Sequence, residues 1–480
     1  MLLVRWLLFR LTFASGMLKL LGGGPAWWGL TALETLFENH WLPTPLSWVA
    51  HQLPAPALRT VLVAVLVAQI AVPVLFFAPV RQLRLFAFWT QVALQVAAML
   101  TGNCSFYHIL VIVLCLSLVD DDWLQGRRQA GAGVPGLLAT LATLVVYGAL
   151  LLGAVFLFEL RLDYGGLAAR TAFTKSDFEE FAQKAVPGSI ALGAAAFLLA
   201  AAEALTSALM DSPGLCSALD AIWKTLVSVA VAALVFGVSL VPFSSLDAAT
   251  QGALPTLLRD VAGPLQQHRL LGQYGLFHEL AGAGGRRELI LEGAHSASGP
   301  WKEIEFKYKP GDVAAAPSFA SPHQPRLDWQ MSLAAAGKLS DNPWMSALAY
   351  RLLTGQAEVI RLLDVKRYPF VAKPPKYVRA MKHGYKFTGW KGGDGSWWSR
   401  SDIRQDYLPV YTAQDKALLE LLTSRKIIGH PEQVKEDSWL VGLLEQLRRF
   451  FDHWEPARLV WAVLLACWAV DLTRGRPWYR

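Results

Sequence analysis

Residues 61–80 read VLVAVLVAQIAVPVLFFAPV and contain no charged side chain. A helix that crosses the hydrocarbon core of a bilayer needs about 20 mostly apolar residues. Only Gln69 and two prolines, Pro73 and Pro79, interrupt the apolar character of this run. The run therefore predicts a membrane-spanning helix, and an integral membrane protein is the first expectation for this chain.

Similar apolar runs occur on both sides of residues 61–80. Further membrane-spanning helices are predicted at Leu85–Leu100, Phe106–Val119, Val134–Phe158, Val186–Met210 and Thr225–Phe243. The apolar stretch Leu459–Val470 is shorter and precedes a tail that contains three arginines. We expect this stretch to be a C-terminal membrane anchor with a short basic tail. Together these runs predict a multi-pass α-helical membrane bundle.

The first apolar segment, Leu2–Leu21, contains three basic residues, Arg5, Arg10 and Lys19. It is either a span whose charges face the bundle or snorkel, or an interfacial helix. A cleaved signal peptide fits less well, because basic residues run through the apolar stretch. Charged groups inside a membrane are functional candidates. One hypothesis is a polar pocket that pairs Glu203 with one of these basic residues, and interfacial placement of Arg5 and Arg10 is the simpler alternative.

The composition divides the chain into a membrane part and an aqueous part. Charged residues make up only 17% of the 480 residues, compared with about 25% in soluble proteins, and the deficit lies in the first half. The net charge of +7 does not indicate nucleic-acid binding, because the basic residues form no stripe. The cysteines Cys104, Cys115, Cys216 and Cys467 form no CxxC pair. We therefore expect buried thiols rather than a metal or redox site.

Basic residues in the loops predict an orientation. Cytoplasmic loops of membrane proteins are enriched in Lys and Arg. Residues 21–57 contain neither, whereas the loops near Arg81 and Arg127 are basic. Alternation of the spans then puts everything from about Ser244 to the last helix on the non-cytoplasmic side. One loop does not fit, since residues 159–185 mix basic and acidic side chains on the predicted outer side.

From Ser244 onward the sequence pattern changes. Glu288–Glu292 and Glu303–Lys309 alternate apolar and charged residues, which predicts an antiparallel hairpin. Tyr377–Phe387 alternates in the same way, and helical patterns occur at Pro343–Leu353 and Gln356–Leu363. These elements predict an α+β domain with a small antiparallel sheet. The predicted domains are residues 1–243 for the transmembrane bundle, 244–455 for the α+β domain, and 456–480 for the anchor and tail.

Several stretches of the chain resemble one known family, the lipase maturation factors. They are Leu3–Lys19, Pro25–Leu33, Leu42–Trp48, Thr101–Phe106, Tyr274–Phe277, Trp301–Asp312, Pro322–Met331 and Pro374–Ala380. The runs PHQPRLDWQM and EFKYKPGD are long and specific. The resemblance covers nearly all of residues 1–410. Family members carry further membrane segments before the part that resembles Met1–Lys19, so the chain is expected to be N-terminally incomplete relative to the family.

The resemblance implies a non-catalytic protein of the endoplasmic reticulum membrane. It implies a role in the folding, assembly and export of secreted lipases such as lipoprotein lipase, with the large C-terminal domain in the lumen. Immature lipases, the lipid bilayer and other folding factors of the endoplasmic reticulum are the implied partners. No cofactor or metal is implied. The loop charges had already indicated the same, non-cytoplasmic side for the C-terminal domain.

His323, Arg326, Asp328 and Trp329 are rich in hydrogen-bonding groups and allow two interpretations. They either form a patch that contacts client proteins, or hold a proline-fixed loop in which Arg326 pairs with a carboxylate such as Asp328 and Trp329 fills the core. We favour the structural interpretation. Nearby Tyr308 ends a predicted strand, on which alternation places Lys307 and Lys309 on the opposite, solvated face.

Trp397, Trp398 and Tyr407 are candidates for an apolar groove that binds client proteins. A place in the core or at the membrane interface fits them equally well. Asn103-Cys104-Ser105 matches the glycosylation pattern. We do not expect Asn103 to be modified, because it lies between two membrane segments and close to the bilayer.

Two other classes of function remain as alternatives. The bundle distantly resembles that of the vitamin K-dependent carboxylase group, which suggests a membrane-embedded enzyme. However, the chain has no GxSxG, no HExxH and no phosphate-binding loop. A transporter is the third class, since Pro73 and Pro187 are able to break helices, although no inverted repeat is apparent.

Overall fold

A computed structural model of the chain describes residues 1–120, 123, 136–163, 166–210, 214–268, 270–272, 285–390, 395–401, 405–428, 439–451 and 453–473. The chain forms two compact units, each discontinuous in sequence. Unit 1 contains Met1–Leu36, Leu53–Ala97 and Ile109–Ala283, and unit 2 contains Phe37–Gln52, Ala98–His108 and Gly284–Arg480. The predicted features at Arg127, Arg128 and Tyr274–Phe277, and the basic tail after Thr473, lie outside the described residues.

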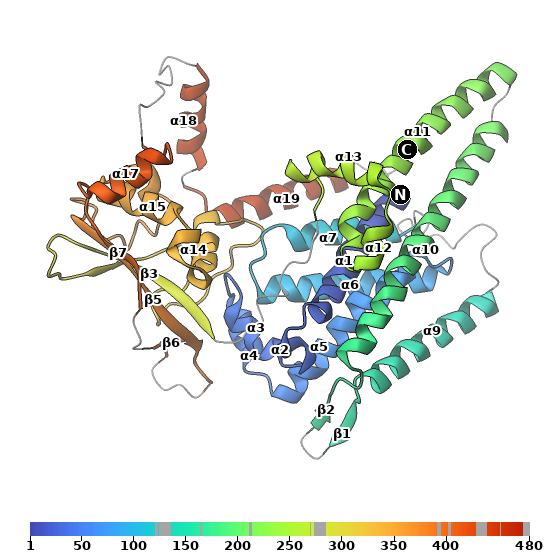
Figure 1. Cartoon of the computed structure of the whole chain (residues 1–480), viewed down its shortest axis with the longest axis horizontal. Coiled ribbons are helices and arrows are strands. Elements are labelled where there is room, and N and C mark those ends of the chain that lie inside the picture. Colours follow the sequence, from blue (N-terminus) through green and yellow to red (C-terminus); the bar gives the residue numbers. More distant parts are fainter. Residues whose placement is uncertain are drawn as a thin grey trace. The chain divides into compact units, whose positions relative to one another are not determined.

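Unit 1 is mostly helical (Figure 1). Its main helices are α1 (Leu2–Leu21), α2 (Pro25–Trp28), α5 (Ala55–Ile70), η1 (Val72–Phe77), α6 (Arg81–Thr101), α7 (Tyr107–Cys115), η2 (Leu116–Leu118), α9 (Gly136–Leu157), α10 (Lys175–Met210), α11 (Leu215–Ser244), α12 (Ala248–Ala253) and α13 (Thr256–Gln267). Helix α3 (Ala32–Asn39) begins in unit 1, and α6 and α7 also cross the boundary with unit 2.

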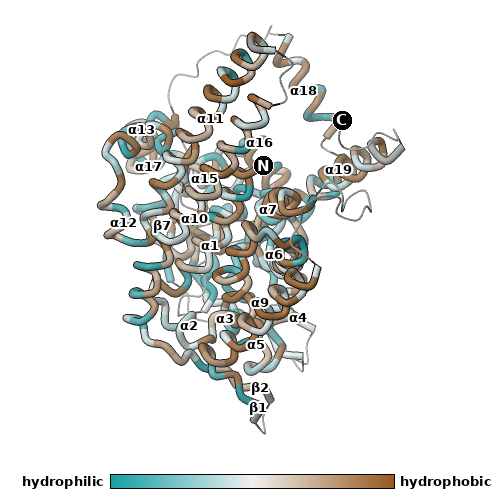
Figure 2. The backbone as a smooth tube through the Cα atoms, turned by 90° about the vertical axis from the view of Figure 1, so that its right-hand side faces the viewer, coloured by the Kyte–Doolittle hydropathy of each residue, from teal (hydrophilic) through white to brown (hydrophobic). Residues whose placement is uncertain are grey.

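Five helices in the described part of the chain are long and apolar enough to cross a membrane. They are Ala55–Phe77, Arg81–Thr101, Gly136–Leu157, Lys175–Met210 and Cys216–Ser244. Figure 2 shows the hydrophobic character along α5 and α9. These helices confirm the multi-pass membrane protein predicted from the sequence. The predicted span at Phe106–Val119 corresponds to a shorter apolar helix, Tyr107–Leu118, and the predicted anchor to Pro456–Val470.

Helix α1 lies inside unit 1 and packs against α5, α10 and α11. Most of its residues are buried, including Trp6, whose ring contacts Phe236 and Phe243 of α11. Its basic side chains bind groups within the bundle. The structure thus agrees with the bundle-facing alternative for Leu2–Leu21 and disagrees with a helix lying free at the interface.

Unit 2 contains a five-stranded antiparallel sheet. Its strands are β3 (Arg286–Ala294), β4 (Lys302–Ile304), β5 (Tyr377–Phe387), β6 (Trp398–Arg400) and β7 (Gln405–Tyr411), in the order β4-β3-β5-β6 with β7 also paired to β5. The helices of this unit are α4 (Pro45–His51), α14 (Arg326–Ala336), η3 (Leu339–Asp341), α15 (Trp344–Leu353), α16 (Ala357–Ile360), α17 (Lys416–Ser424), α18 (Trp439–Phe451) and α19 (Pro456–Thr473).

The core of unit 2 lies between the sheet and the helices α14, α15 and α17 (Figure 1). Because side chains alternate along a strand, Val378 and Ala380 of β5 point into this core and Arg379 points away from it. The helices contribute residues such as Met331, Leu352 and Leu418 from their apolar faces. The core therefore joins residues that are more than 100 positions apart in the sequence.

The predicted α+β architecture is confirmed, with differences in its details. Strands β3 and β4 pair as the predicted hairpin, with Leu291 opposite Ile304, and β5 has the predicted bounds. Strand β4 ends at Ile304, so the predicted strand through Lys309 is wrong. The loop at 159–185, which did not fit the predicted orientation, contains a small hairpin of β1 (Arg161–Asp163) and β2 (Gly166–Ala168). Unit 1 extends past the predicted boundary at Ser244 and includes α12 and α13.

Candidate functional site

Arg286 at the start of β3 is the centre of a buried charged network in unit 2. Its Nε donates to Glu288 at 2.7 Å, and its guanidinium also donates to the backbone carbonyls of Glu38 at 3.0 Å, Trp41 at 2.9 Å and His40. A guanidinium has five donors in a rigid fork, which suits this combination of carboxylate and carbonyl acceptors. Arg286 thereby fastens the segment Phe37–Gln52 to the first strand of the sheet.

Lys309 completes the network from the other side. Its Nζ lies 3.2 Å from Glu288, whose side chain is fully buried. The chain leaves β4 after Ile304 and turns Lys309 inward, so the predicted solvated face for this lysine is wrong. One buried carboxylate thus faces two basic side chains, which satisfies the charge that burial would otherwise make costly.

Asn103 fastens a second segment, Ala98–His108, to the same unit. Its side chain is 2% exposed. The amide oxygen accepts the N–H groups of Ala320 at 2.7 Å and Ser321 at 3.0 Å, and the amide nitrogen donates to the carbonyls of Ser318 at 2.8 Å and Leu42 at 3.2 Å. The side chain joins three separate stretches of backbone, which accounts for an asparagine here without any glycan.

His40 and Cys104 form a further buried contact where these two segments meet. Nε2 of His40 lies 3.0 Å from Sγ of Cys104, and Nδ1 lies 3.2 Å from the carbonyl oxygen of Leu42. Burial lowers the pKa of His40 to about 3 and raises the pKa of Cys104. A nucleophilic cysteine needs a lowered thiol pKa and a basic partner, so this pair has the electrostatics of a structural contact.

Asp328 is held by backbone groups rather than by Arg326. Its carboxylate accepts the N–H of Tyr308 at 2.8 Å and the N–H of Lys309 at 3.0 Å. Burial raises the pKa of Asp328, while these two hydrogen bonds oppose the rise. Arg326 is exposed at the start of α14, and no ion pair joins it to Asp328 in the described residues. The predicted pairing of the two residues is therefore wrong.

The other two candidates, His323 in the loop before α14 and Trp329 within α14, make aromatic contacts. Trp329 packs edge-on against Trp41 with ring centroids 4.1 Å apart, and His323 lies near Tyr308 with centroids 6.1 Å apart. Trp41 belongs to the segment that Arg286 fastens to β3. Trp329 is partly buried and is not part of the hydrophobic core of unit 2, so the structural interpretation of this group of residues stays a prediction.

Trp48, Trp390 and Trp397 form an aromatic cluster at the surface of unit 2, which we call the tryptophan surface. The rings of Trp390 and Trp397 each lie 5.0 Å from the ring of Trp48, edge-on, and Trp390 is 66% exposed. The sequence indicated only Trp397. The sequence did not indicate Trp48 and Trp390, because they approach Trp397 only through the contact of α4 with the end of β5. Trp398, by contrast, is buried and stacks on Phe387, so it does not line a groove.

The charged residues predicted to lie within the membrane do not come together in the structure. Arg5 donates to the carbonyl oxygen of Ser117 at 2.7 Å, Arg10 donates to that of Ser239 at 2.8 Å, and Lys19 donates to Gln69 at 2.8 Å. Glu203 is exposed on α10 and forms no ion pair in the described part of the chain. The hypothesis of a polar pocket around Glu203 is wrong, because the basic residues bind backbone and amide oxygens instead.

A metal site is not apparent among the described residues, since no group of three or more His, Cys, Asp or Glu side chains there is placed to hold an ion. The acidic residues near the end of β4 face basic partners. Arg400 binds Glu303 with two nitrogens at 2.9 Å, and Arg367 lies 3.2 Å from Asp312. The described geometry thus offers buried structural networks and, in the tryptophan surface, an exposed aromatic cluster.

Comparison with known proteins identifies the family. Residues 1–126 match the model of the lipase maturation factor transmembrane domain, and residues 270–409 match that of the lipase maturation factor C-terminal domain. No solved structure matches the chain.

Named relatives extend this match over nearly the whole chain. Lipase maturation factor 2 of Gallus gallus is 39% identical over 98% of this chain and 68% of its own length, and that of Homo sapiens is 40% identical over 98% and 69%. Lipase maturation factor 1 of Bos taurus is 28% identical over 88% of this chain and 63% of its own length. The chain belongs to the lipase maturation factor family, and it is more similar to these factor 2 relatives than to this factor 1 relative.

Proposed function

We propose that this chain is a non-catalytic folding factor of the endoplasmic reticulum membrane, which assists the folding, assembly and export of secreted lipases such as lipoprotein lipase. The observation that carries the proposal is the similarity to lipase maturation factor 2 over 98% of the chain. The membrane helices anchor the factor, and its C-terminal unit works in the lumen. The absence of basic residues from 21–57 supports this orientation.

Client binding takes place at the tryptophan surface of unit 2. Immature proteins expose apolar surface, and a holdase binds it and disfavours aggregation. Exposed aromatic side chains are strong anchors in protein interfaces because they bury much area at little entropic cost. Leu46 and Val49 of the same helix, α4, are each 40% exposed. Other folding factors of the endoplasmic reticulum are further proposed partners.

A rescue experiment tests this function. Cells that lack their own lipase maturation factors and express lipoprotein lipase receive either this full chain or its Trp390→Ser variant. We expect the unchanged chain to restore the specific activity of secreted lipase and the variant to restore only part of it, at an equal protein level. Trp439→Ser is the matched control, because Trp439 is 78% exposed in the same unit but outside the tryptophan surface. Failure of the unchanged chain to restore any lipase activity contradicts the proposal.

A further inference from the structure

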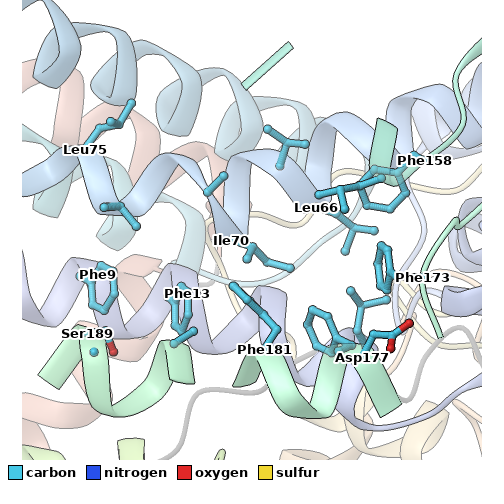
Figure 3. A pocket seen from close by; sticks show the side chains of 18 of the residues that line it. Phe9, Phe13, Leu66, Ile70, Leu75, Phe158, Phe173, Asp177, Phe181 and Ser189 are labelled. Atoms are coloured by element: carbon cyan, nitrogen blue, oxygen red, sulfur yellow. The ribbon is translucent and has the colours of Figure 1, made fainter. Parts of the chain in front are cut away.

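Unit 1 contains a cavity of about 810 Å³ between its helices. Helix α1 lines it with Phe9, Phe13 and Leu20, α5 and η1 line it from Leu66 to Leu75, and α10 lines the remaining side. Figure 3 shows Phe158, Phe173 and Asp177 at one end and Phe9, Leu75 and Ser189 at the other. The cavity is therefore elongated and runs along the helices rather than across them.

The lining excludes most water-soluble ligands. Apart from Asp177 and Ser189, the side chains that face the cavity are apolar. Apolar cavities do not hold ordered water, which needs several polar partners. The cavity is half open to the surface of unit 1, and apolar surface left exposed in this way favours an apolar occupant over water. Because α5 and α10 are long and apolar enough to cross a membrane, the surrounding bilayer supplies apolar chains directly.

The length of the cavity matches one lipid leaflet. Phe9 and Leu20 are 11 positions apart on α1, and Asp177 and Leu192 are 15 positions apart on α10, which corresponds to about 16 Å and about 22 Å at the helical rise per residue. A bilayer is about 40–45 Å thick with its headgroup regions and about 30 Å thick without them, so one leaflet spans about 20–22 Å with the headgroup and about 15 Å without it. The volume also lies within the ~300–1,000 Å³ that is typical of small-ligand pockets. A single acyl chain along α1 and α10 fits these dimensions.

Small residues of α10 leave the space open. Ala185, Gly188 and Ser189 all line the cavity. A Cβ atom added at Gly188 would meet no atom within 4 Å. In contrast, a Cβ atom at Gly193, just beyond the cavity, would lie 2.7 Å from the ring of Trp6. Glycine at 193 serves helix packing, whereas glycine at 188 leaves volume that no side chain in the described part of the chain fills.

Asp177 indicates which kind of lipid enters. Its carboxylate accepts the backbone N–H of Thr174 at 2.9 Å and stays at the solvent-accessible end of the cavity. A negative group at this end attracts an ammonium headgroup and repels the carboxylate of a free fatty acid. We propose that this cavity binds one acyl chain of an ammonium-bearing phospholipid, with the headgroup beside Asp177. The site is independent of the proposed contact with lipases.

Photolabelling of the full chain in nanodiscs tests the proposal. The probe is phosphatidylcholine with a diazirine at the end of one acyl chain, and mass spectrometry locates the adducts. We expect labels to concentrate on Phe9, Phe13 and Leu192, well above those on Leu144 and Leu151, which are exposed on α9 outside the cavity. A diazirine fatty acid at the same concentration gives no such enrichment. Equal labelling of α9 and the cavity, or enrichment with the fatty acid that equals or exceeds that with phosphatidylcholine, overturns the proposal.

Filling the cavity gives the second arm of the experiment. Gly188→Leu should reduce cavity labelling roughly tenfold, the loss expected when about two methylene groups of the tail lose their place. Gly148→Leu is the matched control, because Gly148 on α9 also has nothing within 4 Å and does not line the cavity. Ala185→Leu provides an independent filling variant if Gly188→Leu folds poorly. Unchanged labelling in a well-folded filling variant contradicts the site.

Discussion

Asn103 and Arg286 use their side chains to bind backbone groups of segments that are distant in the sequence. Neither contact follows from a local pattern. The sequence shows Asn103 as a glycosylation motif and Arg286 as one basic residue before an apolar run, because burial depends on contacts between residues up to 248 positions apart. Lys309 illustrates the same limit, since alternation predicted a solvated side chain and the turn after Ile304 buries it.

Asn103 should carry no glycan, because its amide group is enclosed by five backbone partners. Digestion of the membrane-inserted chain with endoglycosidase H should leave its electrophoretic mobility unchanged. The Ser105→Ala variant, which lacks the glycosylation motif, should migrate like the unchanged chain. Asn103→Asp keeps the acceptor but places an oxygen against the carbonyls of Ser318 and Leu42. We expect it to cost about 1–3 kcal/mol of stability. A mobility shift that Ser105→Ala abolishes would contradict the buried position.

Glu288 balances two buried basic side chains, so its removal should be costly. Glu288→Ala leaves Arg286 and Lys309 without their carboxylate, and breaking such a buried pair costs about 3–5 kcal/mol. Glu303→Ala is the control, because its partner Arg400 is partly exposed and such a pair contributes at most about 1 kcal/mol. Thermal unfolding of the purified full chain in detergent measures both variants. Equal unfolding temperatures for the two variants are incompatible with the buried network.

His40 should make unit 2 less stable as the pH falls. Burial holds the pKa of His40 at about 3, compared with 6.5 when the side chain is free. Between pH 3 and pH 6.5 the imidazole of His40 is protonated in the unfolded chain but not in the folded chain. The free energy of unfolding of unit 2 is therefore highest above pH 6.5 and decreases as the pH falls below that value. The expected loss is about 1.4 kcal/mol per pH unit below 6.5. Thermal unfolding at pH 7.5 and 5.5 measures this loss of stability. The His40→Gln variant should lose less stability between the two pH values than the unchanged chain. The control variant His453→Gln, which changes an exposed histidine, should lose as much as the unchanged chain.

The elements differ in how far the sequence predicts them. Long apolar runs and period-two strands depend on local pattern, and β5 has the predicted bounds. The bundle helices overlap the predicted spans, but α10 begins at Lys175 rather than Val186 and α11 at Leu215 rather than Thr225. Helix α14 begins at Arg326, within a stretch that two prolines suggested was a loop. Strands β6 and β7 were not predicted, because short strands become recognisable only through their pairing with β5. The burial of α1 despite its three basic residues depends on acceptors in other helices.

The contact of α1 with α10 should tolerate no side chain at Gly193. A Cβ atom there would lie 2.7 Å from Trp6, whose indole N–H also binds Ser239 of α11. Gly193→Leu should therefore destabilise the bundle by about 1–3 kcal/mol, the usual cost of overpacking. Gly153→Leu on α9, where nothing lies within 4 Å, is the control. Limited proteolysis of the purified chain measures the difference, and equal resistance of the two variants contradicts the packing of these helices.

At the scale of the whole molecule, two segments from the membrane half of the chain belong to unit 2. Phe37–Gln52 and Ala98–His108 join the unit that also contains Gly284–Arg480. The sequence predicted a simple division at Ser244, because composition changes there and composition does not reveal which loops a distant domain binds. The fold class and the family were accessible from pattern and motifs. The tryptophan surface was only partly accessible, because its residues come from two of these segments.

The account predicts that an immature lipase contacts the tryptophan surface directly. The most direct measurement introduces the photocrosslinking residue benzoylphenylalanine at position 390 of the full chain in cells that synthesise lipoprotein lipase. Position 439, which is also exposed in unit 2, serves as the control. After irradiation, newly made lipase should be recovered covalently bound through position 390 and much less through position 439. Recovery of no lipase through position 390, in cells where the chain restores lipase secretion, would contradict this contact surface.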